Sequence, residues 1–213
     1  MAITVWISNN YIEVFGAVTG IIYVFLEIRQ TIWLWPVGII TSAVYIWVFF
    51  TGKLYADMSL QFYYLVISIV GWYWWVEGGG QRAEGSGQNG KSRKEELQVT
   101  RLKLRTGIVL SAVFIPLFAV MWLVIDRLTD SPVPGWDSFI TSLSIIATWM
   151  LARKIFEHWF LWIVVNTAAT VLFLTRGLYP TAFLYTVYGI MSFGGIAAWR
   201  KTIRSELKLP KNE

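Results

Sequence analysis

The chain has 213 residues, of which 56% are hydrophobic and 17% are aromatic. Soluble domains hold about half apolar residues and spread their charges, whereas long stretches of this chain carry none, so a soluble globular protein is excluded. The chain has no cysteine, which excludes disulfides, thiolate metal sites and cysteine nucleophiles.

Seven apolar segments predict seven membrane-spanning helices, because a helix needs roughly 20 apolar residues to cross a hydrocarbon core of about 30 Å. In chain order, the segments cover residues 11–28, 32–50, 57–76, 106–125, 136–152, 159–175 and 180–199. The fourth segment provides 20 consecutive residues without a charge, which is enough to span the core. The connections are short except for a Gly-, Gln- and charge-rich linker at 77–105, which we expect to be flexible at its start and basic at its end.

The distribution of Lys and Arg predicts the orientation of these helices. One side of the membrane would carry only Lys53, Arg127 and Arg176, whereas the other side would carry 15 basic residues, mostly in the linker and the tail at 201–213. Basic loops face the cytoplasm, so we expect the N-terminus outside and the C-terminus in the cytoplasm. Contact of this basic face with the lipid bilayer explains the net charge of +5 without a nucleic-acid partner.

The chain contains an internal repeat. A shift of 124 residues aligns 11–75 with 135–199 without a gap, and 15 of the 65 pairs are identical, several of them Trp, Tyr, Ser or Gly. Because each copy holds three spans, the single span between them lets both copies run the same way across the membrane. We therefore predict an all-α integral membrane protein with seven transmembrane helices. Two parallel three-helix repeats, 10–76 and 136–200, are joined through a central helix at 106–125, a 3+1+3 arrangement.

Polar side chains inside these spans indicate a bundle interior or a transport pathway, because polar groups need partners in lipid. Four helices carry small, polar and aromatic residues at i, i+3 and i+7, on one helix face. These stripes are Trp35/Gly38/Ser42, Gln61/Tyr64/Ser68, Trp159/Trp162/Asn166 and Tyr185/Tyr188/Ser192. The serines also suit close helix packing and the amides suit interhelical hydrogen bonds, but the alignment of the amides with aromatics favours binding. The predicted substrate-binding residues are Trp159, Trp162, Asn166, Gln61, Tyr185, Tyr188, Trp35, Tyr64 and Ser192.

Charged and interfacial residues are expected at the ends of the spans. We expect His158 to be a solvated boundary residue, and Glu27 and Arg29 to form a boundary pair whose side chains reach towards water. We expect Trp75 and Trp199 to belong to the aromatic belt at the membrane surface.

The absence of charge near the middle of every span restricts the ligand. Proton coupling would call for buried carboxylates, and a phosphorylated substrate would call for Arg or Lys. Aromatic faces instead suit a flat neutral ring or a delocalised cation, at about 0.5–2 kcal/mol per cation contact, and Asn, Gln and Tyr can hydrogen-bond an amide or ribose hydroxyls. An enzyme would need a partnered base, metal or nucleophile, and a scaffold would not need matched stripes. We predict a transporter with no catalytic site, metal site or cofactor.

Three features together resemble the PnuC-type vitamin transporters, over about residues 10 to 201. They are the pattern Trp159-x-x-Trp162-x-x-x-Asn166, the following segment GLYPTAFLYTVYGIMSFGGIAAWR, and the 3+1+3 repeat. The resemblance implies a fold similar to the SWEET sugar transporters and a multi-pass protein of the bacterial cytoplasmic (inner) membrane. It implies facilitated diffusion of nicotinamide riboside, a vitamin B3 precursor for NAD biosynthesis, with trapping by cytosolic phosphorylation, and it is compatible with homo-oligomers.

The resemblance carries the binding role over onto Trp159, Trp162 and Asn166. In the first copy the motif degenerates to Trp35 followed by Gly38 and Ser42, so this half is expected to contribute less to binding. The alternatives on the same fold are transport of thiamine, riboflavin or a deoxynucleoside, or of a sugar.

Overall fold

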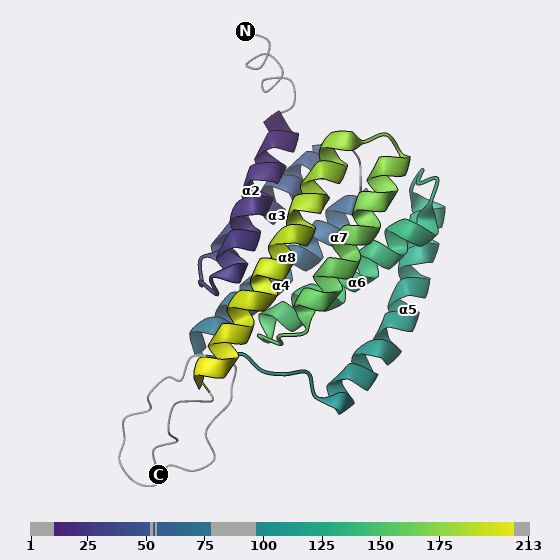
Figure 1. Ribbon diagram of the computed structural model, residues 1–213. Coiled ribbons are helices and arrows are strands. Elements are labelled where there is room, and N and C mark those ends of the chain that lie inside the picture. Colours follow the sequence, from purple (N-terminus) through teal and green to yellow (C-terminus); the bar gives the residue numbers. More distant parts are fainter. Residues whose placement is uncertain (1–10, 52, 54, 78–96, 207–213) are drawn as a thin grey trace, which may run out of the picture.

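The computed structural model describes residues 11–51, 53, 55–77 and 97–206, and this part of the chain forms seven helices (Figure 1). They are α2 (Tyr11–Ile28), α3 (Leu34–Thr51), α4 (Tyr55–Glu77), α5 (Leu104–Leu128), α6 (Pro134–Ala152), α7 (His158–Thr175) and α8 (Tyr179–Glu206). Each predicted span corresponds to one helix, and the largest difference is at α8, which continues past 199 to Glu206. By length and apolar character alone, α3, α5, α7 and α8 can cross a membrane.

The turns that end the helices repeat along the chain. Gln30 and Lys154 follow α2 and α6 and have φ angles of 54° and 49°. Lys53 and Gly177 follow α3 and α7 and have φ angles of 59° and 70°. A residue in this left-handed region commonly ends a helix and reverses the chain. Both pairs are related by the shift of 124 residues, so the repeat extends from the sequence to the backbone.

Six of the helices form a closed ring. Within each repeat, α3 packs against α2 and α4, and α7 packs against α6 and α8. The repeats meet at two equivalent seams, where α2 packs against α8 and α4 packs against α6. Equivalent helices of the two repeats run in the same direction (Figure 1). This confirms the predicted all-α membrane architecture, with α5 as the helix between the repeats.

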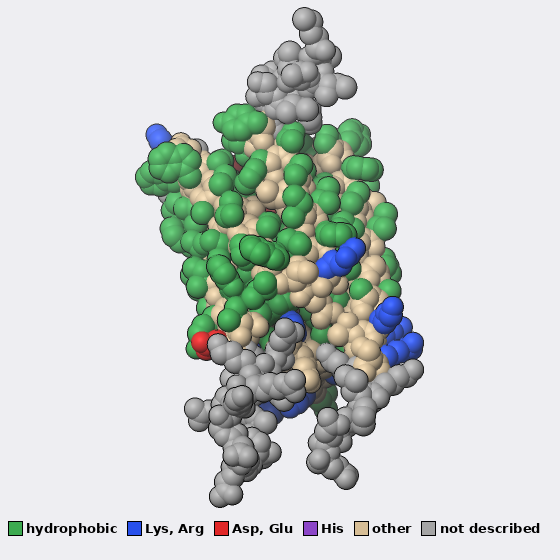
Figure 2. All heavy atoms as spheres, turned by 90° about the vertical axis from the view of Figure 1, so that its left-hand side faces the viewer, with side chains coloured by type: hydrophobic (Ala, Val, Ile, Leu, Met, Phe, Trp, Pro, Cys, Tyr) green, Lys and Arg blue, Asp and Glu red, His purple; other side chains and the backbone are tan. Residues whose placement is uncertain are grey.

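The outer surface is apolar. Hydrophobic side chains cover most of the face in Figure 2, and most of its Lys and Arg side chains lie towards the lower end. Helix α5 packs outside the ring against α6, buries none of its side chains, and leaves Ile115 70% exposed. An apolar surface of this extent is suited to lipid.

One end of the bundle is basic. Helices α2, α4, α6 and α8 all end there, and Arg29, Arg153 and Arg200 lie there. We call it the basic end.

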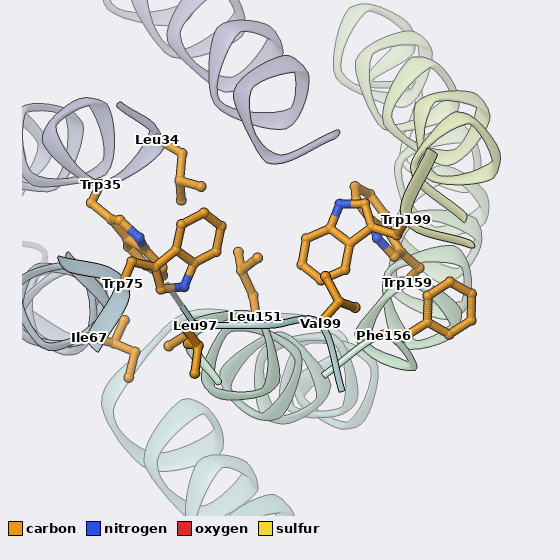
Figure 3. Close-up of a cluster of buried hydrophobic side chains, with 11 residues drawn as sticks. Leu34, Trp35, Ile67, Trp75, Leu97, Val99, Leu151, Phe156, Trp159 and Trp199 are labelled. Atoms are coloured by element: carbon orange, nitrogen blue, oxygen red, sulfur yellow. The ribbon is translucent and has the colours of Figure 1, made fainter. Parts of the chain in front are cut away.

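A core of buried hydrophobic side chains lies at the basic end (Figure 3). It contains two edge-to-face tryptophan pairs, Trp35 with Trp75 (ring centroids 5.5 Å apart, 86° between planes) and Trp159 with Trp199 (5.9 Å, 82°). The first indole of each pair lies on a glycine of the following helix: a Cβ on Gly71 or Gly195 would lie 2.4 Å from the ring. The expected belt positions of Trp75 and Trp199 were wrong, since they are 6% and 0% exposed. Each indole finds an aromatic partner inside the bundle.

The end of the linker is held against the turn between α6 and α7. The Thr100 N–H donates to the carbonyl oxygen of Lys154 over 2.9 Å, and the Phe156 N–H donates to that of Thr100 over 2.9 Å. Leu97 and Val99 are buried in the core. The expected flexible start of the linker falls on residues 78–96, outside the described residues. The main chain just before α5 is anchored by these backbone bonds.

Candidate functional site

A cavity of about 360 Å³ lies within the ring of six helices. All six helices contribute to its described lining, with the repeats on opposite sides. Small-molecule sites commonly have volumes of about 300–1,000 Å³ and combine aromatic walls with a few placed polar groups. The cavity has this character and lies where the two repeats meet.

The predicted stripes turn towards this cavity. Every member of three stripes lines it, namely Gln61/Tyr64/Ser68, Trp159/Trp162/Asn166 and Tyr185/Tyr188/Ser192. In the remaining stripe, Gly38 and Ser42 line the cavity, whereas Trp35 is outside the lining and packs on Gly71 and Trp75. Trp35 therefore joins α3 to α4, and we leave it out of the candidate site.

Asn166 is the best-placed polar group on α7. It is 5% exposed, and its Nδ2 donates to the Ser192 hydroxyl over 3.4 Å. The Ser192 hydroxyl in turn donates to the carbonyl oxygen of Tyr188 over 2.8 Å. Within the described residues, the Asn166 amide makes this one side-chain hydrogen bond. A carbonyl oxygen and a second N–H are therefore available for a ligand.

Aromatic and unpaired polar groups complete the walls. The Tyr185 and Tyr188 rings pack edge to face, with centroids 5.8 Å apart. Among the described residues, the buried indole N–H groups of Trp159 and Trp162 and the hydroxyl of Thr41 have no hydrogen-bond partner. All three residues line the cavity. An unsatisfied buried donor costs about 1–3 kcal/mol, so a polar ligand or water in the cavity would stabilise this arrangement.

Glu27 and His158 form a buried pair at the basic end of the cavity. Glu27 lines the cavity, and its Oε1 lies 3.0 Å from Nε2 of His158. The side chains are 2% and 0% exposed, and Nδ1 of His158 donates to the carbonyl oxygen of Ile155 over 2.6 Å. The prediction of a solvated His158 was wrong, as was the Glu27–Arg29 pair, because Arg29 instead lies over the ring of Phe25. The partners are 131 residues apart in the chain, so local sequence gave no sign of their contact.

The stripe comparison also missed a face of α2. Gly16, Gly20, Tyr23 and Glu27 line the cavity, at spacings of four, three and four residues that keep them on one helix face. Gly20 allows close approach, since a Cβ there would lie 2.0 Å from the Tyr188 hydroxyl. The same spacing rule could have found this face. On α6, the missed lining residues include Ser144 and Thr148.

Comparison with known proteins agrees with this architecture. The family model described as "Nicotinamide mononucleotide transporter" matches residues 10–201. The nicotinamide riboside transporter PnuC of Escherichia coli (strain K12) is 27% identical, over 92% of this chain and 87% of the relative. The riboflavin/roseoflavin transporter RibM of Streptomyces davaonensis is 26% identical, over 88% of this chain and 83% of the relative.

A solved structure shares the fold. The crystal structure of the vitamin B3 transporter PnuC superposes with a TM-score of 0.71 at 25% identity, covering 96% of this chain and 86% of that chain. The relatives are transporters rather than enzymes, in agreement with the expectation from sequence. With the family model matching nearly the whole chain and the seven-helix fold matching a solved transporter, the chain belongs to the nicotinamide mononucleotide transporter family, the family of the PnuC transporters.

Proposed function

We propose that this protein carries nicotinamide riboside across the membrane by facilitated diffusion. The observation that carries the proposal is the composition of the cavity: tryptophan, tyrosine and amide side chains line it, and Glu27 is the one charged residue in its described lining. Nicotinamide riboside is a flat pyridinium cation bearing a carboxamide and a ribose. Each part has a matching group in the cavity.

The ligand would be held by stacking and by hydrogen bonds. The indole of Trp162 and the rings of Tyr185 and Tyr188 offer π faces that attract a delocalised cation. Asn166 and Gln61 lie on different repeats and offer both a donor and an acceptor for the carboxamide or the ribose hydroxyls. Contacts from both repeats would make binding sensitive to their relative position, as alternating access requires.

The family description and one relative's name suggest two other ligands, a mononucleotide and riboflavin, and the charge of the cavity favours neither. A mononucleotide carries a phosphate, which Arg or Lys side chains recognise, and neither type is found in the described lining. Riboflavin has a neutral flat ring and is the second candidate, because a relative is named as a riboflavin transporter. Its ring carries no positive charge for the Glu27 carboxylate to attract.

A ligand panel tests the proposal. Purified protein would be mixed with nicotinamide riboside, nicotinamide mononucleotide, riboflavin or thiamine, and its melting temperature measured. A ligand present at a hundredfold its dissociation constant stabilises the folded state by about 2.7 kcal/mol. We expect nicotinamide riboside to raise the melting temperature most. Stabilisation by riboflavin but not by nicotinamide riboside would contradict the proposal in favour of the second candidate.

The proposed orientation places the basic end in the cytoplasm of a bacterium, following the positive-inside bias. Because the chain has no cysteine, single cysteines can report it. We expect Asp130→Cys, in the loop before α6, to react with a membrane-impermeant maleimide in intact cells. Ser205→Cys, near the end of α8, should react only after the membrane is opened. Labelling of Ser205→Cys but not of Asp130→Cys in intact cells would show that the basic end faces outwards.

A further inference from the structure

The Glu27–His158 pair breaks the internal symmetry of the protein. The shift of 124 residues places Leu151 at the position of Glu27 and Leu34 at the position of His158. Leu34 and Leu151 are both 0% exposed and lie in the core beside the Trp35–Trp75 pair (Figure 3). One seam between the repeats thus holds two leucines where the other holds a carboxylate and an imidazole.

The fold does not require a polar pair at this place. At the equivalent place in the other seam, Leu34 and Leu151 pack the two repeats together with apolar side chains alone. Replacing a buried ion pair with well-packed hydrophobic residues is often neutral or stabilising, because two charged groups lose their hydration on burial. The polar pair is therefore more readily explained by function than by stability.

The pair is built to hold a carboxylate at the cavity. The His158 ring lies against both Trp159 and Trp199, with centroids 4.8 and 4.7 Å away. The Trp199 indole N–H donates to the Glu27 carbonyl oxygen over 3.0 Å. The side chain and the main chain of Glu27 are thus both anchored by the second repeat. Within the described residues, His158 bonds Oε1 of the carboxylate, and no side chain bonds Oε2.

The protons of the pair can be assigned in part. A carbonyl oxygen can only accept, so Nδ1 of His158 carries a hydrogen towards Ile155. The contact between Nε2 and Oε1 needs one further proton, and the pair has no net charge whichever of the two atoms holds it. The pair therefore leaves no uncompensated charge at the cavity. A cationic ligand that enters would compete with His158 for the carboxylate.

We propose that Glu27 is the charge-selecting residue of the transporter: it favours ligands whose ring carries a positive charge over neutral rings of the same shape. Glu27 lies one turn from Tyr23 on α2, and both line the cavity with Trp159. Ring faces and a carboxylate then act on the same delocalised charge, in a site where the low dielectric strengthens the attraction. His158 is a positioning residue that holds the carboxylate. This inference rests on the proposed function, since it concerns the same ligand.

The test compares two ligands that differ by one hydride. Nicotinamide riboside is cationic, and its dihydro form has a neutral ring with the same carboxamide and ribose. Dissociation constants for both would be measured by calorimetry on the purified full-length protein. We expect the unmodified protein to prefer the cation by about tenfold or more. In Glu27→Gln, which keeps the volume and a hydrogen bond to His158, this preference should fall towards one, through weaker binding of the cation alone.

A matched control and a second variant make the test decisive. Glu157→Gln removes an acid next to His158 that bonds the Leu102 N–H instead of lining the cavity, and it should leave the preference unchanged. His158→Gln can still donate a hydrogen bond to the carboxylate but removes the proton that balances its charge, so it should raise the preference for the cation. This variant also decides the matter if Glu27→Gln is too unstable to purify.

The outcomes separate the inference from the proposed function. An unchanged preference in Glu27→Gln, or in His158→Gln if that variant alone can be purified, would overturn the charge-selecting role while the transporter proposal stands. Equal binding of the cationic and dihydro forms by the unmodified protein would also overturn the charge-selecting role and leave the transporter proposal standing. If the unmodified protein binds neither form, the proposed function itself fails.

Discussion

Replacing Gly195 with alanine is expected to destabilise the protein strongly. The new Cβ would lie 2.4 Å from the Trp159 ring, and this ring cannot move easily because it is 1% exposed and packs against His158 and Trp199. Overpacking of this kind costs about 1–3 kcal/mol, which corresponds to a fall of roughly 2–12 °C in the melting temperature of a chain of this size. Thermal unfolding of purified protein measures it.

The neighbouring glycine provides the control. Gly194 is exposed on the same helix, and a Cβ there would meet nothing within 4 Å, so Gly194→Ala should keep or raise the melting temperature. Equal stability of the Gly194→Ala and Gly195→Ala variants would show that the close contact between α7 and α8 is absent in solution.

Replacing Asn166 with leucine is expected to weaken the binding of nicotinamide riboside by about 5- to 150-fold, the equivalent of 1–3 kcal/mol for hydrogen bonds lost in a buried site. The free amide groups of Asn166 are lost, and a ligand carboxamide or hydroxyl would stay unpaired. The folded protein should keep its stability, because the Ser192 hydroxyl still donates to the Tyr188 carbonyl. Calorimetry and thermal unfolding of the same samples separate these effects.

Thr167 is the matched control for Asn166. It is the next residue of α7 and is exposed on the outside of the bundle, so Thr167→Val should leave the dissociation constant unchanged. An Asn166→Leu variant with unaltered affinity would remove Asn166 from the site.

Local patterns in the sequence predicted most of the fold and much of the candidate site. Apolar segment length located all seven helices, because each must cross the same thickness of lipid. The spacing i, i+3, i+7 identified Trp162, Asn166 and Tyr188 as cavity-lining, because residues on one helix face must turn either inwards or outwards.

The errors concern residues whose surroundings depend on distant parts of the chain. His158 resembled a boundary residue because it begins a helix, yet Glu27, 131 residues away, and two indoles bury it. Trp35 shares its stripe with Gly38 and Ser42 but packs on Gly71 of α4. The direction of a large side chain near a helix end is decided by the neighbouring helix, which spacing within one helix cannot report.

The contact of each indole with a glycine backbone limits how the molecule can deform. Trp35 on Gly71 and Trp159 on Gly195 leave no gap between α3 and α4 or between α7 and α8. We therefore expect α3 with α4, and α7 with α8, each to move as a rigid body during a transport cycle. Sliding or opening is then confined to the borders of α2 with α8 and of α4 with α6. The border of α2 with α8 is held by the polar contact between Glu27 and His158, which a ligand can replace. The border of α4 with α6 has Leu34 and Leu151 at the equivalent positions, so the two borders need not open together.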